Sequence, residues 1–294
     1  MSAQESAAPD GRRTGPGRTK IRHKLAVRDL RVVGVRLVGP RMVRVTVAGP
    51  ELVDLEAQGP TDHVKVFFPD PTTGHLAAPV LTAEGLERPS SGTLHVRDYT
   101  PRAYRSRGPT GPELDLDLVL HGDVGPASTW AGHATVGDRL VVAGPKGSKL
   151  VPPGVTSVLL GGDETALPAI ARWLELLPVD VAVRVLAEVD SAADETYLDQ
   201  VGPAGRPLEI SWLHRHGRAP GTEPLLERAV QRRGLVDRST FVWFGGEAGT
   251  LRGVRRHLRR DLRLTARQAE VSGYWRLGEA AFDHHAPIDP SDPD

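Results

Sequence analysis

Short stretches in which apolar and polar residues alternate dominate the first half of the chain. A period of two predicts strands that expose one face to a core and the other to polar surroundings. Gly and Pro turns separate these stretches, and only one helix is predicted among them, at 126–134. A closed antiparallel barrel of the Greek-key type is therefore expected. Its predicted strands are 31–38, 42–47, 63–68, 93–99, 113–120 and 138–143.

The pattern changes after Pro153. Residues 156–160 form a continuous apolar run, as in a parallel strand that is buried on both faces. Strands and helices then alternate with short connections, which predicts an α/β, Rossmann-like parallel sheet. The further predicted strands are 181–189, 208–213, 239–244 and 270–275, and the predicted helices are 165–177, 223–233 and 250–262.

The change of pattern predicts two domains with a boundary near residue 150, a barrel at 25–150 and an α/β domain at 151–280. Residues 1–24 mix Gly, Pro, Arg and Ser without periodicity and are expected to be a disordered tail. Eight basic residues between Arg12 and Arg31 leave a nucleic-acid-binding arm as the alternative. Residues 281–294 are acidic, contain no Lys or Arg, and are also expected to be disordered.

Composition narrows the class of protein. The 37 basic and 37 acidic residues balance, which argues against a general nucleic-acid or membrane-surface binder. The absence of cysteine excludes disulfides, thiolate zinc sites and Cys-ligated iron–sulfur clusters, so an organic cofactor must carry any electrons. No apolar run is long enough to span a membrane, and the N-terminus lacks the apolar core of a signal peptide. A cytoplasmic protein is expected, with the monomer as the working assumption.

Two segments have the chemistry to hold a flavin dinucleotide. Arg97, Tyr99 and Thr100 place a cation, an aromatic ring and a hydroxyl on one predicted strand. About 20 residues later, a glycine-rich turn opens the predicted helix, whose free first-turn amides can bind an anion such as a pyrophosphate. An aromatic side chain can lie against an isoalloxazine, and a hydroxyl can bond its reactive nitrogen. The alternative is an ordinary barrel strand followed by an ordinary capped helix.

Five segments together resemble the siderophore-interacting protein family, whose known members are ferric-siderophore reductases of the ferredoxin–NADP reductase superfamily. The resemblance covers residues 25–280, and its most distinctive part is Gly-Asp-Glu-Thr-Ala-Leu-Pro-Ala-Ile at 162–170. It implies a flavin-binding barrel followed by a nicotinamide-binding domain. The five segments are 97–102, 117–131, 162–170, 246–248 and 274–278.

The resemblance implies roles for nine residues of the first two segments. Arg97 would pair with the FAD pyrophosphate, Tyr99 would lie against the flavin ring, and Thr100 would hydrogen-bond near N5. The remaining positions would border the cofactor or bind its phosphates. The complete FAD set is Arg97, Tyr99, Thr100, Asp117, His121, Gly122, Gly125, Ala127 and Ser128.

A second glycine-rich turn follows the buried strand at 156–160 and starts a helix. This position is the carboxyl edge of the sheet, where open α/β folds bind ligands. The turn lacks the G-x-G-x-x-G fingerprint, so a helix cap with close packing is the alternative interpretation. The resemblance implies NADPH or NADH contacts at Gly162, Asp163, Glu164, Thr165, Gly246 and Glu247.

The choice between the two dinucleotides stays open. Glu188 ends a predicted strand and could accept a hydrogen bond from a ribose 2′-hydroxyl, which suits NADH. His214, Arg215 and Arg218 follow the next strand and could bind the 2′-phosphate of NADPH. Either group could also be ordinary surface charge.

The resemblance implies an NAD(P)H-dependent reductase that releases Fe(II) from a ferric siderophore without general acid–base chemistry. Lys65 and Arg276 match positions where basic residues flank the flavin and attract the anionic iron complex. No metal site is expected, because neither His214 and His216 nor His284 and His285 have a carboxylate or a third histidine at useful spacing. The alternatives are a reductase for a separate protein acceptor and a non-catalytic siderophore-binding flavoprotein.

Overall fold

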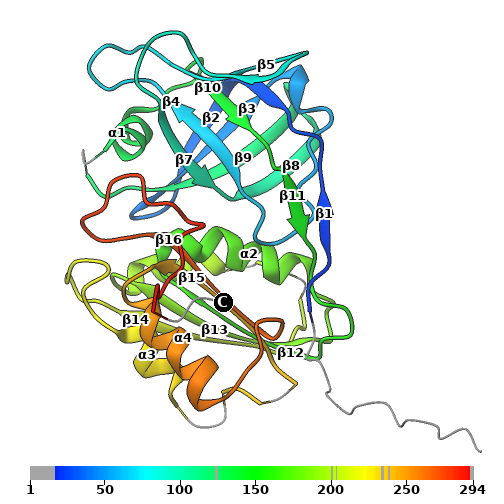
Figure 1. Ribbon diagram of the computed structural model, residues 1–294, viewed down its shortest axis with the longest axis vertical. Coiled ribbons are helices and arrows are strands. Elements are labelled where there is room, and N and C mark those ends of the chain that lie inside the picture. The colour runs from blue at the N-terminus through cyan, green and yellow to red at the C-terminus, as the bar shows by residue number, and fades with distance from the viewer. Residues whose placement is uncertain are drawn as a thin grey trace, which may run out of the picture.

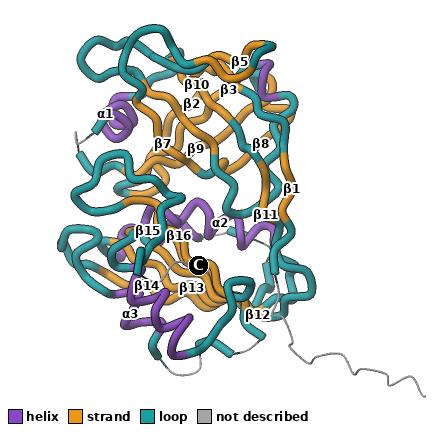
Figure 2. The backbone as a smooth tube through the Cα atoms, in the orientation of Figure 1, coloured by secondary structure: helices purple, strands orange, loops and turns teal. Residues whose placement is uncertain are grey.

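The computed structural model describes residues 17–122, 125–199, 201–202, 204–232, 235–237 and 239–291. Figure 1 shows two units stacked along the long axis of the molecule, an antiparallel sheet above and a parallel sheet below. The tube in Figure 2 shows that strands joined by long loops form the upper unit, whereas helices flank the sheet of the lower one. These units correspond to the two patterns in the sequence.

The upper unit is a seven-stranded antiparallel sheet in the order β7-β4-β10-β2-β3-β9-β8. Its two edge strands follow one another in the chain and are separated only by Thr100, so the sheet curls into a barrel. Leu114, Leu116 and Leu118 of β9 point into its core, and α1 (Pro126–His133) packs against that core. The strands are β2 (Val27–Gly39), β3 (Met42–Ala48), β4 (Val64–Phe68), β7 (His95–Tyr99), β8 (Pro101–Gly108), β9 (Gly111–Val119) and β10 (Arg139–Ala143).

Strand β8 is absent from the sequence-based prediction. Its sequence, PRAYRSRG, is too polar to show an apolar alternation. Charge pairs with β9 take the place of apolar contacts, since Arg105 bonds Glu113 at 3.0–3.1 Å and Asp115 at 2.7–2.8 Å. The short remaining elements are η1 (Pro50–Leu52) and the hairpin of β5 (Val80–Thr82) and β6 (Gly85–Glu87).

The lower unit is a five-stranded parallel sheet in the order β14-β13-β12-β15-β16. Helix α2 covers the face turned toward the barrel, and α3 and α4 cover the other (Figure 1). This is the doubly wound arrangement that the sequence predicted. Its strands are β12 (Ser157–Gly162), β13 (Ala182–Val189), β14 (Leu208–His214), β15 (Phe241–Glu247) and β16 (Ala269–Trp275), and its helices are η2 (Glu164–Ala166), α2 (Leu167–Leu176), η3 (Ala192–Leu198), α3 (Leu225–Val230), α4 (Leu251–Arg256) and η4 (His257–Asp261).

The structure differs from the expectation of two disordered tails. In the N-terminal segment 1–24, β1 (Lys20–Arg22) pairs with β11 (Gly147–Lys149), and the buried Arg18 side chain lies over the Trp173 ring at 4.8 Å. Near the other end, Ile288 is buried against the α/β core. Composition does not reveal these long-range contacts. Residues 1–16 and 292–294 of the predicted tails lie outside the described residues.

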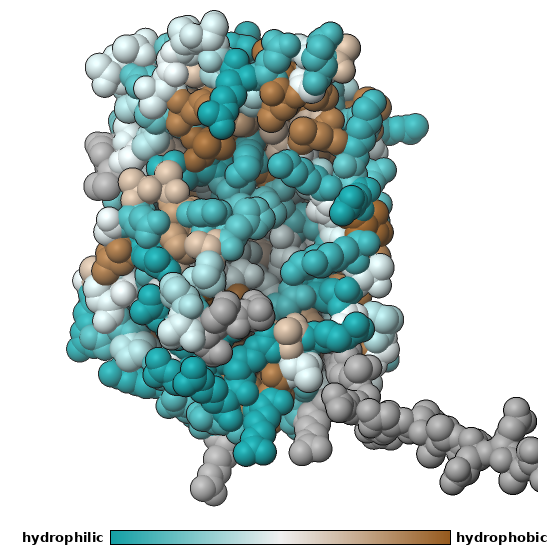
Figure 3. All heavy atoms as spheres, viewed as in Figure 1, coloured by the Kyte–Doolittle hydropathy of each residue, from teal (hydrophilic) through white to brown (hydrophobic). Residues whose placement is uncertain are grey.

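The surface in Figure 3 is mainly hydrophilic over the lower unit, and hydrophobic side chains gather over the upper one. Val80, Leu81 and Leu86 of the β5–β6 hairpin are among the exposed apolar residues. Within the described part of the chain, none of the helices has the length and apolar character needed to cross a membrane.

Candidate functional site

Strand β7 carries the aromatic and cationic residues singled out in the sequence. Its register with β4 pairs Val66 with Arg97 and Val64 with Tyr99, so Arg97 and Tyr99 lie on one face of the sheet. The Tyr99 ring meets the Phe68 ring edge-on at 5.9 Å. Burial raises the pKa of the Tyr99 hydroxyl, which keeps it neutral at physiological pH.

Arg97 has the free donors that an anion requires. Its guanidinium donates one hydrogen bond, to the Val96 carbonyl at 2.7 Å. Among the residues that the structure describes, no carboxylate pairs with it. A half-buried arginine with uncommitted N–H groups fits a bidentate contact with a phosphate.

The glycine-rich turn before α1 offers the complementary backbone. The Ser128 hydroxyl closes it, because it accepts from the His121 amide at 3.1 Å and donates to the Gly122 carbonyl at 2.8 Å. Gly125 precedes the helix at φ 82°, and the space beside it is open, as a phosphate approaching the backbone needs. No side chain caps α1, so the first-turn amides at Ala127 and Ser128 are available. These features fit an FAD pyrophosphate.

Asp117, which the resemblance implies contacts the cofactor, is bonded within the protein. Its carboxylate is buried and accepts two hydrogen bonds from Arg44, both at 2.7 Å. The Tyr197 hydroxyl of η3 also donates to it across the domain junction. Because these bonds already use both oxygens, we assign Asp117 to joining the two units instead of contacting the cofactor.

At the carboxyl edge of the parallel sheet, Asp163 holds three segments together. Its buried carboxylate accepts from the Thr165 amide at 2.9 Å, the Glu247 amide at 2.9 Å and the Trp275 indole at 2.8 Å. The ends of β12, β15 and β16 are thereby tied to one side chain. Burial raises the pKa of Asp163, and these hydrogen bonds oppose that shift.

The glycines at this edge permit close approach of the backbone. A Cβ on Gly162 would lie 2.4 Å from the Gly245 carbonyl oxygen, and Gly246 has φ 144°. Glu247 is buried and accepts from the Thr250 amide at 2.6 Å and from the Leu277 amide at 3.1 Å. Asp163 and Glu247 thus shape the edge with their side chains, and the backbone of the glycines forms its rim.

A cavity of about 480 Å³ opens beside this rim. Arg276 lies on it with a buried Nη2 that has no hydrogen-bond partner among the described residues, a donor suited to an anion. The Arg276 guanidinium also packs over the Phe282 ring at 4.8 Å and lies 3.5 Å from Glu279. The cavity is lined by Gly221, Thr222, Pro224, Glu227, Glu247, Gly249, Thr250, Arg252, Arg276 and Leu277.

Two of the residues that were expected to distinguish NADH from NADPH are buried. Arg215 is 2% exposed and pairs with Glu164 at 2.9 Å and with Glu188 at 3.4 Å. Glu188 is itself 3% exposed, so neither Glu188 nor Arg215 can reach a ribose without breaking this cluster. Arg218 stays exposed, 3.5 Å from Glu223. Of the predicted phosphate ligands, only His214 and Arg218 keep access to solvent.

Glu188→Gln is expected to stabilise the protein at high pH. Burial and the nearby charge of Asp163 raise the pKa of Glu188 from 4.5 to about 7. The native state favours the protonated acid, so its stabilising effect is complete below pH 4.5 and is lost as pH rises through 7. Glutamine does not ionise. The free energy of unfolding in urea should therefore nearly match wild type at pH 4.5 and exceed it by about 3 kcal/mol at pH 8.

Glu209→Gln is the matched control for that measurement. Glu209 lies on the neighbouring strand, faces Arg184 at 3.6 Å and is largely exposed. The free energy of unfolding of Glu209→Gln should equal that of wild type at both pH values. If Glu188→Gln raised the free energy of unfolding equally at both pH values, ionisation of Glu188 would not be the cause of the stabilisation.

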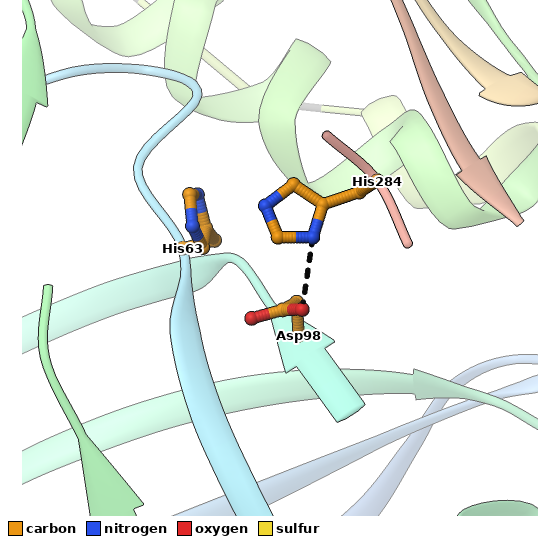
Figure 4. Close-up of side chains that lie close together, drawn as sticks. All are labelled: His63, Asp98 and His284. Atoms are coloured by element: carbon orange, nitrogen blue, oxygen red, sulfur yellow. Dashed lines mark ion pairs between the residues drawn. The ribbon is translucent and has the colours of Figure 1, made fainter. Parts of the chain in front are cut away.

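Lys65 lies in a cluster that the sequence did not predict. It pairs with Asp98 across β4 and β7, at 3.1 Å from each carboxylate oxygen. His284 Nδ1, from the C-terminal segment, lies 3.1 Å from the same carboxylate (Figure 4). Burial opposes ionisation of Asp98, but the hydrogen bond from His284 and the charge of Lys65 lower its pKa to about 2.

The expectation that His284 lacks a carboxylate partner is therefore wrong. The C-terminal segment folds back onto β7, and spacing along the chain cannot show this contact. His63 joins the cluster, with its ring centroid 4.7 Å from that of His284. Desolvation lowers the pKa of the His63 ring, although the residue as a whole remains exposed. The one available signal was that His63 and Lys65, two residues apart, share a face of a strand.

Two family models match consecutive parts of the chain. Residues 31–149 match the siderophore-interacting FAD-binding domain, and residues 155–278 match the siderophore-interacting protein model. A relative from Escherichia coli named NADPH-dependent ferric-chelate reductase is 31% identical over 87% of this chain and 95% of its own length. A ferric vibriobactin reductase from Vibrio cholerae is 30% identical over 88% of this chain and 92% of its own length.

Solved structures agree in fold. A siderophore utilization protein from T. fusca is 42% identical, has a TM-score of 0.83, and is matched over 92% of this chain and 100% of its own. A ferredoxin NADP+ reductase from Neisseria gonorrhoeae shares the fold alone, at 15% identity and a TM-score of 0.57 over 85% of this chain and 99% of its own. The predicted ferredoxin-reductase-like arrangement of a barrel and a Rossmann-like sheet is confirmed.

Proposed function

This chain belongs to the siderophore-interacting protein family, and we propose that it is an FAD-containing, NADPH-dependent reductase that releases Fe(II) from ferric siderophores. The observation that carries the proposal is the pairing of Arg97, which has no carboxylate partner among the described residues, with the uncapped start of α1. NADPH is favoured over NADH because Glu188 is buried, whereas Arg218 is exposed. We propose that the protein works as a monomer in the cytoplasm.

Each unit has its own part in this function. FAD, when bound, accepts two electrons from a hydride donor and passes them on singly, which Fe(III) requires. In our proposal, residues 25–150 bind FAD, with Arg97 and the α1 amides on its pyrophosphate, Tyr99 against its ring and Thr100 at its edge. Residues 151–280 bind the dinucleotide in the cavity beside Gly162 and Gly246, where Arg276, expected from the resemblance to attract the siderophore, would instead meet the anionic groups of the dinucleotide.

Release of iron follows from ligand preference. Hard anionic oxygen ligands hold Fe(III) more strongly than Fe(II), so reduction loosens the complex. No side chain has to transfer a proton in this step. The protein positions the donor and acceptor and attracts the substrate. We propose that the ferric siderophore is an anion and that Lys65, 43% exposed, attracts it.

Lys65→Gln is expected to raise the KM for anionic ferric siderophores by about tenfold, because it removes a cation and leaves the negative charge of Asp98 without its lysine partner. The KM for an uncharged ferric complex should change less than about twofold, and reduction of the flavin by NADPH should be unaffected. Lys149→Gln is the control, since Lys149 is equally exposed and also pairs with a carboxylate, Glu270, at 3.2 Å. The same loss for charged and uncharged complexes would rule out attraction by Lys65.

One anaerobic assay distinguishes the reductase from its rivals. The purified protein is mixed with NADPH, and a ferric siderophore and a ferrous trap are then added. A yellow protein that bleaches and forms trapped Fe(II) supports the proposal. Bleaching without iron reduction would favour a separate protein acceptor, and colour that does not bleach would favour a non-catalytic siderophore-binding flavoprotein.

A further inference from the structure

We propose that His63, Asp98 and His284 form a binding site for a divalent first-row metal ion, and that its physiological occupant is the ferrous ion released by the proposed reductase. The existence of the metal site stands on the geometry of this cluster. The choice of ferrous iron as occupant rests on the proposed reductase function.

The three side chains come from separate elements and converge. Lys65 and Asp98 are opposite one another in the β4–β7 ladder and share a face of the sheet, and His63 lies just before β4, two residues from Lys65. His284 reaches this face from the C-terminal segment (Figure 4). One ligand atom from each of His63, Asp98 and His284 lies within 4.8 Å of the others. Ligands of one such ion lie about 3–4 Å apart, so small side-chain movements complete the site.

A second observation is that one imidazole nitrogen of the cluster is free to bind an ion. The Nε2 atom of His284 is buried and has no hydrogen-bond partner among the described residues. Buried polar atoms are rarely left unpaired without a reason, and a bound ion is one such reason. The His285 ring stacks 4.0 Å from that of His284 and adds a further imidazole at the rim.

The donor set suits ferrous iron better than ferric iron. Two imidazoles and one carboxylate form the set that binds non-haem Fe(II) and leaves positions open for water. In the absence of a metal ion, Lys65 balances the charge of Asp98. Its exposed ammonium can move into solvent when a cation binds. Lys65, which we propose attracts the ferric siderophore, pairs with Asp98 at 3.1 Å, so this site borders the proposed approach of the substrate. A ferrous ion leaving its siderophore there would meet the cluster.

Equilibrium dialysis of the tag-free holoprotein against Zn²⁺, followed by elemental analysis, tests the site without catalysis. Wild type should bind one equivalent, and His284→Ala and Asp98→Asn should each weaken that binding at least tenfold. His257→Ala is the matched control, because it removes another histidine–aspartate pair, His257 with Asp261 at 2.9 Å, and should bind as wild type. No zinc in wild type, or equal zinc in His284→Ala, would overturn the site.

The occupant is tested with ferrous salt added directly under anaerobic conditions, and separately with one round of turnover on a ferric siderophore. After rapid desalting, wild type should retain about one iron per chain in both cases, and His284→Ala should retain at least tenfold less. Zinc binding without retention of added Fe(II) would overturn the ferrous assignment. Retention of added Fe(II) with no iron reduction in turnover would instead reject the proposed reductase and, with it, the ferrous product as occupant.

Discussion

Replacing Arg97 with alanine is expected to give a colourless protein that no longer retains FAD through purification. The guanidinium has donors free for an anion and lies on the strand beside α1. A charge-assisted bidentate contact contributes about 3 kcal/mol, so the Kd for FAD should rise about 100-fold. Titration of the apoprotein with FAD, followed by quenching of flavin fluorescence, measures this change. Ferric reduction should fall in proportion to the lost flavin.

Arg31→Ala provides the comparison for that variant. Arg31 is an exposed arginine of the same barrel, and its guanidinium donates to the Gly137 carbonyl at 3.2 Å. FAD affinity should stay at the wild-type value. If Arg97→Ala bound FAD as tightly as Arg31→Ala, the pyrophosphate would have to lie elsewhere and the proposed cofactor site would be wrong.

Asp163→Ala is expected to have the largest effect on use of NADPH. It removes the acceptor that ties the turn after β12 to the Glu247 amide and the Trp275 indole. Leaving these buried donors unpaired should destabilise the protein by about 3–5 kcal/mol. The rim of the cavity should then lose its shape, which we expect to raise the KM for NADPH more than tenfold. Anaerobic stopped-flow measurement of flavin reduction gives that constant.

Asp237→Ala separates the loss of rim geometry from the loss of stability. Asp237 caps the opposite end of β15 and accepts from the Ser239 amide at 2.8 Å and the Thr240 amide at 2.9 Å. Its removal should lower the free energy of unfolding but leave the KM for NADPH within twofold of wild type. A KM that rises equally in both variants would mean that Asp163 acts only on stability.

The repeated patterns in the sequence predicted most of the fold. Residues 156–160 were recognised as a buried strand because β12 is covered by helices on both faces and must be apolar throughout. Strand β8 was missed because its arginines pair with acids of β9 instead of filling a core. The structure of the termini was also missed, since Arg18 and His284 depend on partners far away in the chain.

In the candidate site too, local features could be predicted from the sequence and long-range contacts could not. Local features such as the turn at Gly125 could be predicted, because small residues before a helix leave amides free whatever surrounds them. The surroundings of Glu164 and Asp117 could not be predicted, since each carboxylate is fixed by an arginine on another element, Arg215 for Glu164 and Arg44 for Asp117. Sequence patterns indicate which backbone can approach a ligand more reliably than which side chains stay available to it.

The most direct test of electron flow counts ferrous ions per NADPH. FAD-loaded protein is mixed anaerobically with a limiting amount of NADPH, an excess of ferric siderophore and a ferrous trap. The account predicts two trapped ferrous ions for each NADPH consumed, with the flavin reoxidised at the end. NADPH consumed while the flavin stays bleached and no ferrous ion forms would contradict it.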